Sequence, residues 1–265
     1  MASEKKGTAL ITGASTGIGA IYADRLARQG YDLILVARNQ ARLNALAREL
    51  GDATGRAIEV MPADLTEPAD LRRVETTLRQ DASITVLVNN AGFGAATPLV
   101  DSDVDQMERM VDLNVTALTR LAYAAVPGFV ARGAGTVINI SSIVAIAPEL
   151  LNGVYGASKA FVLALSQSLN HELADKGVRV QAVLPGVTAT DFWSIAGMAL
   201  ENLPPTMVMT ADAMVDASLA GLAQGERVTI PGLHDGDSWT RHEAARQAMS
   251  PHLSASTPAS RYLAG

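Results

Sequence analysis

The sequence predicts an α/β protein with a doubly wound parallel sheet of about seven strands and helices on both faces. Short apolar runs rich in β-branched residues recur along the chain, and amphipathic stretches of helical period separate them. Strands with little polar alternation, each followed by a helix, are typical of a parallel sheet that is buried on both faces. The predicted strands are Thr8–Thr12, Asp32–Ala37, Ala57–Met61, Thr85–Asn89, Thr136–Ser141, Val178–Leu184 and Val228–Ile230.

Helical patterns fill the segments between these strands. Helices are predicted over Gly17–Gln29, Arg42–Leu50 and Glu67–Gln80. The stretches Val104–Val130 and Val154–Leu173 carry apolar residues on more than one face, which fits either core packing or a subunit interface. Pro127 is expected to end or kink the first of them. No linker rich in Pro, Gly or Ser divides the chain, so residues 1–265 are predicted to form a single domain.

Composition excludes several classes of function. The 265 residues include no cysteine, so disulfides, thiolate zinc sites and a cysteine nucleophile are excluded. With 21 Lys+Arg against 27 Asp+Glu the formal net charge is −6, and no basic run suggests nucleic acid as a partner. Glycine, asparagine and proline interrupt the two uncharged stretches at 7–23 and 82–100, so neither is predicted to be an export signal or a membrane span. We expect a cytoplasmic protein.

A glycine cluster follows the first predicted strand and opens a helix. Backbone N–H groups at a helix N-terminus are unsatisfied and glycine lets the chain approach a ligand closely, so such a turn suits a phosphate group. The residues expected at this turn are Gly13, Ser15, Thr16, Gly17, Ile18 and Gly19. The same residues match a GxSxG nucleophile elbow with Ser15 as nucleophile, and the histidines that could complete a hydrolase triad are His171, His234, His242 and His252. That elbow normally follows a central strand well into the sheet, which disfavours a serine hydrolase.

Polar residues at fixed spacing follow the later strands. Tyr155 and Lys159 lie four residues apart at the start of a predicted helix, and therefore share one face. Ser142 precedes Tyr155 by 13 positions, at the end of the fifth strand. Asn89-Asn90-Ala91-Gly92 closes the fourth strand, Asn114 lies in a helical segment, and Pro185-Gly186 follows the sixth strand.

Together these motifs resemble those of the classical short-chain dehydrogenase/reductase family over roughly Gly7 to Asp191. The resemblance implies a Rossmann-type fold and the interconversion of a ketone or aldehyde and an alcohol. It also implies a catalytic tetrad of Asn114, Ser142, Tyr155 and Lys159, with Ser141 as the less well spaced candidate for the serine. The residues implied in cofactor binding are the glycine cluster, Asp64, Leu65, Asn90, Ala91, Gly92, Tyr155, Lys159, Pro185, Gly186, Thr188 and Thr190.

The chemistry of carbonyl reduction fits those residue types. A hydride goes to carbon and a proton goes to oxygen, which requires a positioned acid such as Tyr155. The ammonium of Lys159 and the charge of the cofactor are expected to lower the pKa of this tyrosine together, and Ser142 would donate to the carbonyl oxygen as charge develops. By resemblance, Asn114 holds a water that links Lys159 to solvent. Some of the implied residues also have an alternative role without catalytic or binding function. Tyr155 and Lys159 could be an ordinary solvated pair, Asn114 could kink or bridge a helix, and Asp64 could cap one.

The end of the second strand predicts NADP(H) as the cofactor. An NAD site places an acidic residue there to bind the ribose hydroxyls, whereas this chain has Ala37 followed by Arg38. Arg38 can bind the 2′-phosphate of NADP bidentately and stack on adenine, and no carboxylate is expected to oppose it. Alternatively, Arg38 points to solvent at the start of a helix.

Residues 191–210 are expected to form a lid over the nicotinamide. The apolar residues of this segment are Phe192, Trp193, Ile195, Met198, Leu200, Leu203, Met207 and Met209. They favour a small hydrophobic carbonyl or alcohol substrate, although core packing would use the same residue types. A non-catalytic NADP sensor on the same fold is the main alternative function.

Two further expectations concern partners. The family resemblance and the extra apolar helix faces predict a homodimer or homotetramer. His234, Asp235, Asp237 and His242 could together bind a metal, but their spacing lacks a helical ligand face, so we expect surface residues and no metal site.

Overall fold

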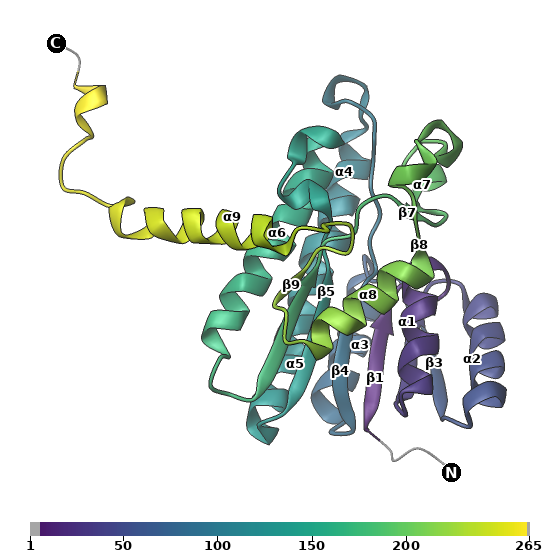
Figure 1. The fold of residues 1–265 in the computed structure, drawn as a ribbon. Coiled ribbons are helices and arrows are strands. Elements are labelled where there is room, and N and C mark those ends of the chain that lie inside the picture. Colours follow the sequence, from purple (N-terminus) through teal and green to yellow (C-terminus); the bar gives the residue numbers. More distant parts are fainter. Residues whose placement is uncertain (1–5, 264–265) are drawn as a thin grey trace. The chain divides into compact units, whose positions relative to one another are not determined.

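The computed structural model describes residues 6–263, which divide into two compact units, one up to Pro231 and the other from Gly232 on. The first unit contains a seven-stranded sheet whose strands all pair in parallel, in the order β3-β2-β1-β4-β5-β6-β9 (Figure 1). The strands are β1 (Thr8–Thr12), β2 (Asp32–Ala37), β3 (Ile58–Pro62), β4 (Ile84–Asn89), β5 (Gly135–Ile140), β6 (Val178–Val183) and β9 (Val228–Thr229). The predicted doubly wound sheet is therefore confirmed, with strand ends displaced by no more than a residue.

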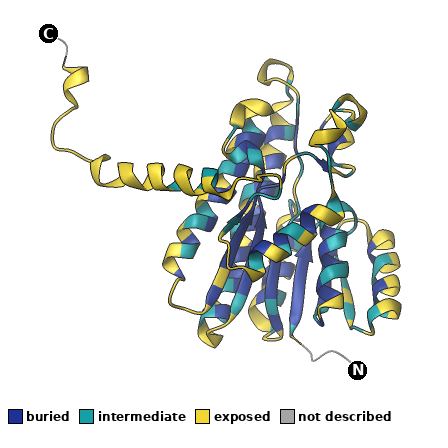
Figure 2. Cartoon of the chain, viewed as in Figure 1, coloured by how far each residue is buried: buried dark blue, intermediate teal, exposed yellow. Residues whose placement is uncertain are grey.

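Helices cover both faces of this sheet (Figure 1). One face packs against α1, α2 and α8, and the opposite face packs against α3, α5 and α6. The helices of the first unit are α1 (Gly17–Arg28), α2 (Gln40–Thr54), α3 (Pro68–Gln80), α4 (Val104–Val111), α5 (Leu118–Arg132), α6 (Gly153–Glu172), α7 (Phe192–Ile195) and α8 (Ala211–Ala223). Figure 2 shows the strands as the most buried layer, which agrees with their lack of polar alternation.

The expectation that Pro127 could end this helical stretch was wrong. Helix α5 continues through Pro127 to Arg132. Pro127 and Tyr123, whose carbonyl loses its helical donor, are both exposed, so water can replace the missing N–H. The interruption lies earlier, where Asp112–Ala117 form a π-helical stretch between α4 and α5. Asn114 lies inside this stretch, and such bulges are frequent at functional sites.

The switch in strand order brings the functional loops to one edge of the sheet. β1 pairs with both β2 and β4, so the chain crosses to the other half of the sheet after β3. Loops after the carboxyl ends of parallel strands meet there, and this is where ligands bind in open α/β sheets. A small second sheet, β7 (Thr188–Ala189) paired in parallel with β8 (Met209–Thr210), closes the base of the 191–210 segment on the same side.

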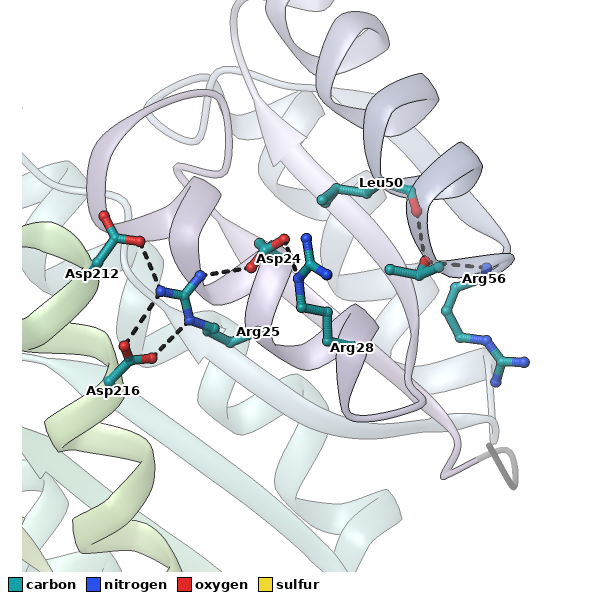
Figure 3. A network of polar contacts seen from close by, with 8 residues as sticks. Asp24, Arg25, Arg28, Leu50, Arg56, Asp212 and Asp216 are labelled. Atoms are coloured by element: carbon teal, nitrogen blue, oxygen red, sulfur yellow. Dashed lines mark hydrogen bonds and ion pairs between the residues drawn. The ribbon is translucent and has the colours of Figure 1, made fainter. Parts of the chain in front are cut away.

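Helix α8, which follows that small sheet, is fixed to α1 by polar contacts. Arg25 of α1 binds Asp212 and Asp216 of α8 at 2.7 Å each, and it also binds Asp24 of its own helix (Figure 3). Deeper in the interface, the Tyr22 hydroxyl lies 2.5 Å from Ser218 Oγ. The exit of the 191–210 segment is thereby held against the helix that begins at the glycine cluster.

The second unit contains α9 (Gly236–Met249), and none of its described residues is buried. Asp235 caps α9 by accepting from Asp237 N, and His242 stacks on Trp239. Residues 6–263 contain no group of three or more His, Asp or Glu side chains placed to hold a metal ion. No helix within the same range is both long and apolar enough to cross a membrane.

Candidate active site

The glycine cluster forms a tight turn between β1 and α1. Gly13 has φ +66°, and a Cβ on Gly19 would lie 2.3 Å from the Gly13 carbonyl oxygen, so both positions require glycine. Thr16 precedes α1 but its side chain makes no capping hydrogen bond. The first N–H groups of α1 therefore keep their capacity for an anion.

Asn90 joins this turn to the end of β4. Its Nδ2 donates to the carbonyl oxygens of Thr12 and Gly13 at 2.9 and 3.2 Å. The Thr12 hydroxyl in turn accepts from the backbone N–H groups of Asn90 and Ala91, both at 3.0 Å. Thr12 looks like an ordinary strand residue in the sequence, yet its hydroxyl fixes the two loops to each other.

Arg38 directly follows β2, and Arg42 lies in the first turn of α2. Arg38 is 81% exposed along its side chain, with Nη1 4.0 Å from Asp64 Oδ2. A carboxylate thus does approach Arg38, because β2 and β3 are neighbouring parallel strands that end at the same edge. Arg42, which sequence analysis missed, lies four residues further on and 3.9 Å from Asp191. Its position four residues after Arg38, in the first turn of the helix that follows β2, is the signal that could have found it.

Asp64 and Leu65 have clear structural roles in this structure. Asp64 Oδ1 accepts from the Thr66 N–H and hydroxyl, so it organises the turn before α3. The Leu65 side chain lies in the core on the α3 and α5 face, and its backbone is the part left to meet a ligand.

The serine, tyrosine and lysine of the predicted tetrad meet at the end of β5. Ser142 forms a hydrogen bond with Tyr155, whereas the Ser141 hydroxyl donates to the Lys159 carbonyl at 2.7 Å. Tyr155 and Ser142 are only 5% and 8% exposed. The geometry therefore brings Ser142, and not Ser141, to the tyrosine hydroxyl.

Burial controls the titration of this pair. It raises the pKa of Tyr155 to about 12, and only the hydrogen bond with Ser142 acts in the opposite direction. It lowers the pKa of Lys159 to about 8. Lys159 Nζ donates to the Ile140 carbonyl at 2.9 Å and lies 5.8 Å from the centre of the Tyr155 ring. Lys159 is not among the causes of the shift in the tyrosine pKa, in which loss of solvation is the largest effect.

Asn114, the fourth residue of the predicted tetrad, lies in the π-helical stretch. Its Nδ2 donates to the Phe93 carbonyl at 2.9 Å and to Ser158 Oγ at 3.1 Å, while its Oδ1 accepts from Phe93 N–H at 3.1 Å. A Cβ on Gly92 would lie 2.8 Å from Asn114 Oδ1 and 3.5 Å from Lys159 Nζ. Asn114, Gly92 and Lys159 therefore lie together, with the side chain of Asn114 committed to the loop after β4.

The loop after β6 closes the site from the other side. The Pro185 carbonyl accepts from Ile143 N–H at 3.0 Å, and Thr188 Oγ1 donates to the Gly186 carbonyl at 3.2 Å. A Cβ on Gly17 would lie 3.2 Å from Thr190 Cγ2. The glycine cluster and this loop are hence in direct proximity, as a ligand that spans both would require.

An apolar cluster surrounds the Tyr155 ring and is separate from the two cores of the sheet. Sequence analysis proposed Phe192 as part of an apolar lid but missed most other members. The cluster consists of Ala95, Met107, Met110, Val144 and Tyr155, with Phe93, Leu151, Val154 and Phe192 packed against it. These residues come from five separate segments, so no single periodic pattern could reveal them.

Comparison with known proteins decides the family. A model of the short chain dehydrogenase family matches residues 7–197. The chain belongs to the short-chain dehydrogenase family. The match decides against the hydrolase interpretation of Ser15. Members of this family are oxidoreductases that act on CH–OH groups with NAD(H) or NADP(H).

Solved structures of other short-chain dehydrogenases resemble this chain along nearly its whole length. A short-chain dehydrogenase from Sphingobium yanoikuyae in complex with NADPH is 50% identical, with a TM-score of 0.94 over 97% of this chain and 99% of that one. The bulky-bulky ketone specific alcohol dehydrogenase from Comamonas testosteroni is 46% identical, with a TM-score of 0.91 over 98% and 100% of the two chains. The serine 3-dehydrogenase of Agrobacterium fabrum is 39% identical over 188 residues, or 70% of this chain and 74% of that protein.

Proposed function

We propose that this short-chain dehydrogenase is an NADP(H)-dependent oxidoreductase that interconverts a hydrophobic ketone or aldehyde and the corresponding alcohol. The observation that carries the proposal is the setting of Tyr155. Its hydroxyl is hydrogen-bonded to Ser142, while its ring lies in the apolar cluster. A carbonyl oxygen fits the polar side of this site, and apolar substituents fit the other side.

The residues of the site divide the work of the reaction. A bound nicotinamide supplies or accepts the hydride. In reduction, Tyr155 gives its proton to the carbonyl oxygen and Ser142 donates a hydrogen bond as negative charge develops there. Tyr155 carries its proton at neutral pH, because burial raises its pKa to about 12, so this proton is available for the carbonyl oxygen. Asn114 holds the backbone of Phe93, which directly follows Gly92, the residue that faces Lys159, and so shapes this side of the site.

The residues that would hold the cofactor fit NADP(H). The α1 N-terminus lacks a side-chain cap and can receive the pyrophosphate, and Gly13 and Gly19 allow the tight turn that leads into it. We assign the 2′-phosphate to Arg38 and Arg42. The pairing of Arg38 with Asp64 spans 4.0 Å and its side chain is 81% exposed, so it can turn to a phosphate at low cost. The NADPH complex of the relative that is 50% identical supports this choice.

The substrate class follows from the apolar cluster and from the second relative. That relative is described as specific for bulky-bulky ketones, and it matches this chain over 98% of its length. We infer that this chain also takes ketones whose two substituents are both bulky and apolar. Met107 and Met110 in the cluster suit such substrates, because their flexible side chains adapt to irregular shapes.

Assembly is proposed from exposed apolar residues on α4, α5 and α6. Val104, Tyr123 and Phe161 are 75%, 70% and 40% exposed on these three helices. Large apolar side chains on neighbouring helices mark interaction surfaces. We infer that a homodimer or homotetramer covers them. The cytoplasmic location expected from the sequence stays a prediction.

The decisive experiment measures NADPH consumption by the purified full chain against a panel of ketones. The panel contains dialkyl, aryl alkyl and diaryl ketones together with polar sugars. We expect turnover to be fastest with the bulky apolar members. NADPH binding without turnover of any member would instead support the sensor, and a sugar as the best substrate would overturn the hydrophobic class.

A further inference from the structure

Phe192, the first residue of α7, packs against the tyrosine of the site. Its ring centre lies 5.6 Å from that of Tyr155, at an interplanar angle of 45°. A Cβ built on Gly94 would lie 2.4 Å from Phe192 Cζ and 3.3 Å from Tyr155 Cδ2. The Phe192 ring thus fills a notch between Gly94 and Tyr155, and the notch exists because position 94 has no side chain.

The backbone around Phe192 is held in place on both sides. Trp193 Nε1 donates to the Thr188 carbonyl at 2.9 Å, and the Trp193 side chain is buried. The Ala96 N–H donates to the Ala196 carbonyl at 3.1 Å, which ties the end of α7 to the loop after β4. Neighbouring Ile195, by contrast, is 62% exposed. The backbone on both sides of Phe192 is therefore fixed, and the Phe192 side chain points toward Tyr155.

The reacting groups are largely covered, and the Phe192 ring lies against one of them. Tyr155 and Ser142 are 5% and 8% exposed, although the site has to admit a ketone. The Phe192 side chain has no polar atom and is only half-buried, so ring packing alone holds it. A change of its rotamer would empty the notch beside Tyr155 while the Trp193 hydrogen bond persists.

We propose that Phe192 is a gate and the residue that determines which ketone sizes this enzyme accepts. It swings out to admit a ketone and then packs on the larger apolar substituent, with Gly94 providing the space for the closed position. This inference rests on the proposed function, because it specifies the substrate of the same site. The Phe192 side chain alone selects ketones by size, and the rest of α7 does not.

Four variants of the full chain test the gate: Phe192→Ala, Gly94→Ala, the double variant, and the control Ile195→Ala on the same short helix. Each is assayed for kcat/KM with acetophenone and with benzophenone, at saturating NADPH. We expect Phe192→Ala to raise the ratio of kcat/KM for benzophenone over acetophenone at least about tenfold. Ile195→Ala should leave this ratio within about twofold of the wild type.

The Gly94 variants test the notch itself. The added methyl of Gly94→Ala collides with the Phe192 ring and should lower kcat/KM for both ketones about tenfold or more. When residue 192 is already alanine, Gly94→Ala should lower kcat/KM by less than about threefold. Equal losses in both backgrounds, or an unchanged ketone ratio in Phe192→Ala, would overturn the proposal.

A binding measurement separates failure of the gate from failure of the proposed function. Calorimetric titration of each ketone into the protein with NADP⁺ allows no hydride transfer, so it reports the pocket alone. We expect Phe192→Ala to bind benzophenone at least about tenfold tighter, relative to acetophenone, than the wild type does. If no variant turns over any ketone, the reaction proposal fails, and this titration alone decides for or against the gate.

Discussion

The side-chain amide of Asn114 binds both backbone groups of Phe93. Its Nδ2 donates to the Phe93 carbonyl at 2.9 Å, and its Oδ1 accepts from the Phe93 N–H at 3.1 Å. Asn114 lies in the π-helical stretch, and Phe93 belongs to the loop that follows β4. One side chain thus sets the path of the loop that runs between Lys159 and the apolar cluster.

Replacement of Asn114 should therefore harm both stability and activity. Asn114→Ala leaves the N–H and C=O of Phe93 without these partners, at a cost of about 1–3 kcal/mol in the free energy of unfolding. Turnover should fall further than the loss of folded protein explains, because the loop beside Lys159 shifts. Urea unfolding and kcat measured on the same sample give both effects. Asn170→Ala, which removes an amide bound to the Ser166 carbonyl, should leave kcat nearly unchanged.

Cofactor preference should reverse when the end of β2 is given an acidic residue. In the variant Ala37→Asp/Arg38→Ala, the carboxylate repels the 2′-phosphate and accepts hydrogen bonds from the ribose instead. NADPH binding should weaken by about 2–3 kcal/mol while NADH binding improves. Fluorescence titration with both cofactors measures the shift. Arg28→Ala is the control, since that arginine also pairs with an aspartate, at 2.8 Å, on a different part of the surface. A wild-type protein that binds NADH as tightly as NADPH would contradict the assignment.

Removal of the buried ammonium should stabilise the protein in the absence of cofactor. Burial lowers the pKa of Lys159 from 10.5 to about 8, so between these values the unfolded chain binds more protons and stability rises with pH. Below about pH 8 the lysine is charged in both the folded and the unfolded state, so the full cost of burying this charge reduces the free energy of unfolding. Lys159→Met relieves about 3 kcal/mol of it but leaves the Ile140 carbonyl without its donor, so we expect a net gain of about 1–2 kcal/mol at pH 7.

Urea unfolding of Lys159→Met at pH 7 and at pH 10 checks the sign of this effect. The gain should shrink as the pH rises, because the wild-type lysine then loses its charge in the folded state. Lys176→Met, at an exposed position, should show no such trend. A variant that is less stable than the wild type at pH 7 would show that the hydrogen bond to Ile140 outweighs the burial of charge.

Light scattering tests the proposed assembly. A homodimer or homotetramer should give two or four times the 27.7 kDa of one chain at micromolar concentration. Tyr123→Glu or Phe161→Glu should shift the mass downward, because a charge in an apolar interface lacks a partner. A wild-type protein that stays at the mass of one chain would exclude both assemblies at that concentration.

The fold could be predicted from the sequence because its signals are local. Each strand of the main sheet is a short apolar run, and β1 and β2 begin and end at the predicted residues. The π-helical stretch could not be predicted, since one extra residue per turn hardly changes the apolar pattern around Asn114. The expectation that Pro127 ends the helix failed because the effect of a proline depends on whether water reaches the carbonyl of Tyr123. That access is a property of the folded surface and not of the local sequence.

The candidate site was partly predictable for a similar reason. The spacing of Ser142, Tyr155 and Lys159 is visible in the chain, and the structure brings them together. Contacts between distant segments gave no such signal. The approach of Asp64 to Arg38 depends on strand order, and the fit of Phe192 against Gly94 depends on how a loop and a short helix meet across the site.

The most direct test of the central claim compares wild-type protein with Tyr155→Phe in the reduction of a bulky ketone by NADPH. The variant keeps the ring in the apolar cluster but has no proton to give, so kcat should fall at least about a hundredfold while the Kd for NADPH changes less than about threefold. Tyr123→Phe, at a residue that is 70% exposed, should keep full activity. Near-normal turnover by Tyr155→Phe would contradict the assignment of Tyr155 as the acid.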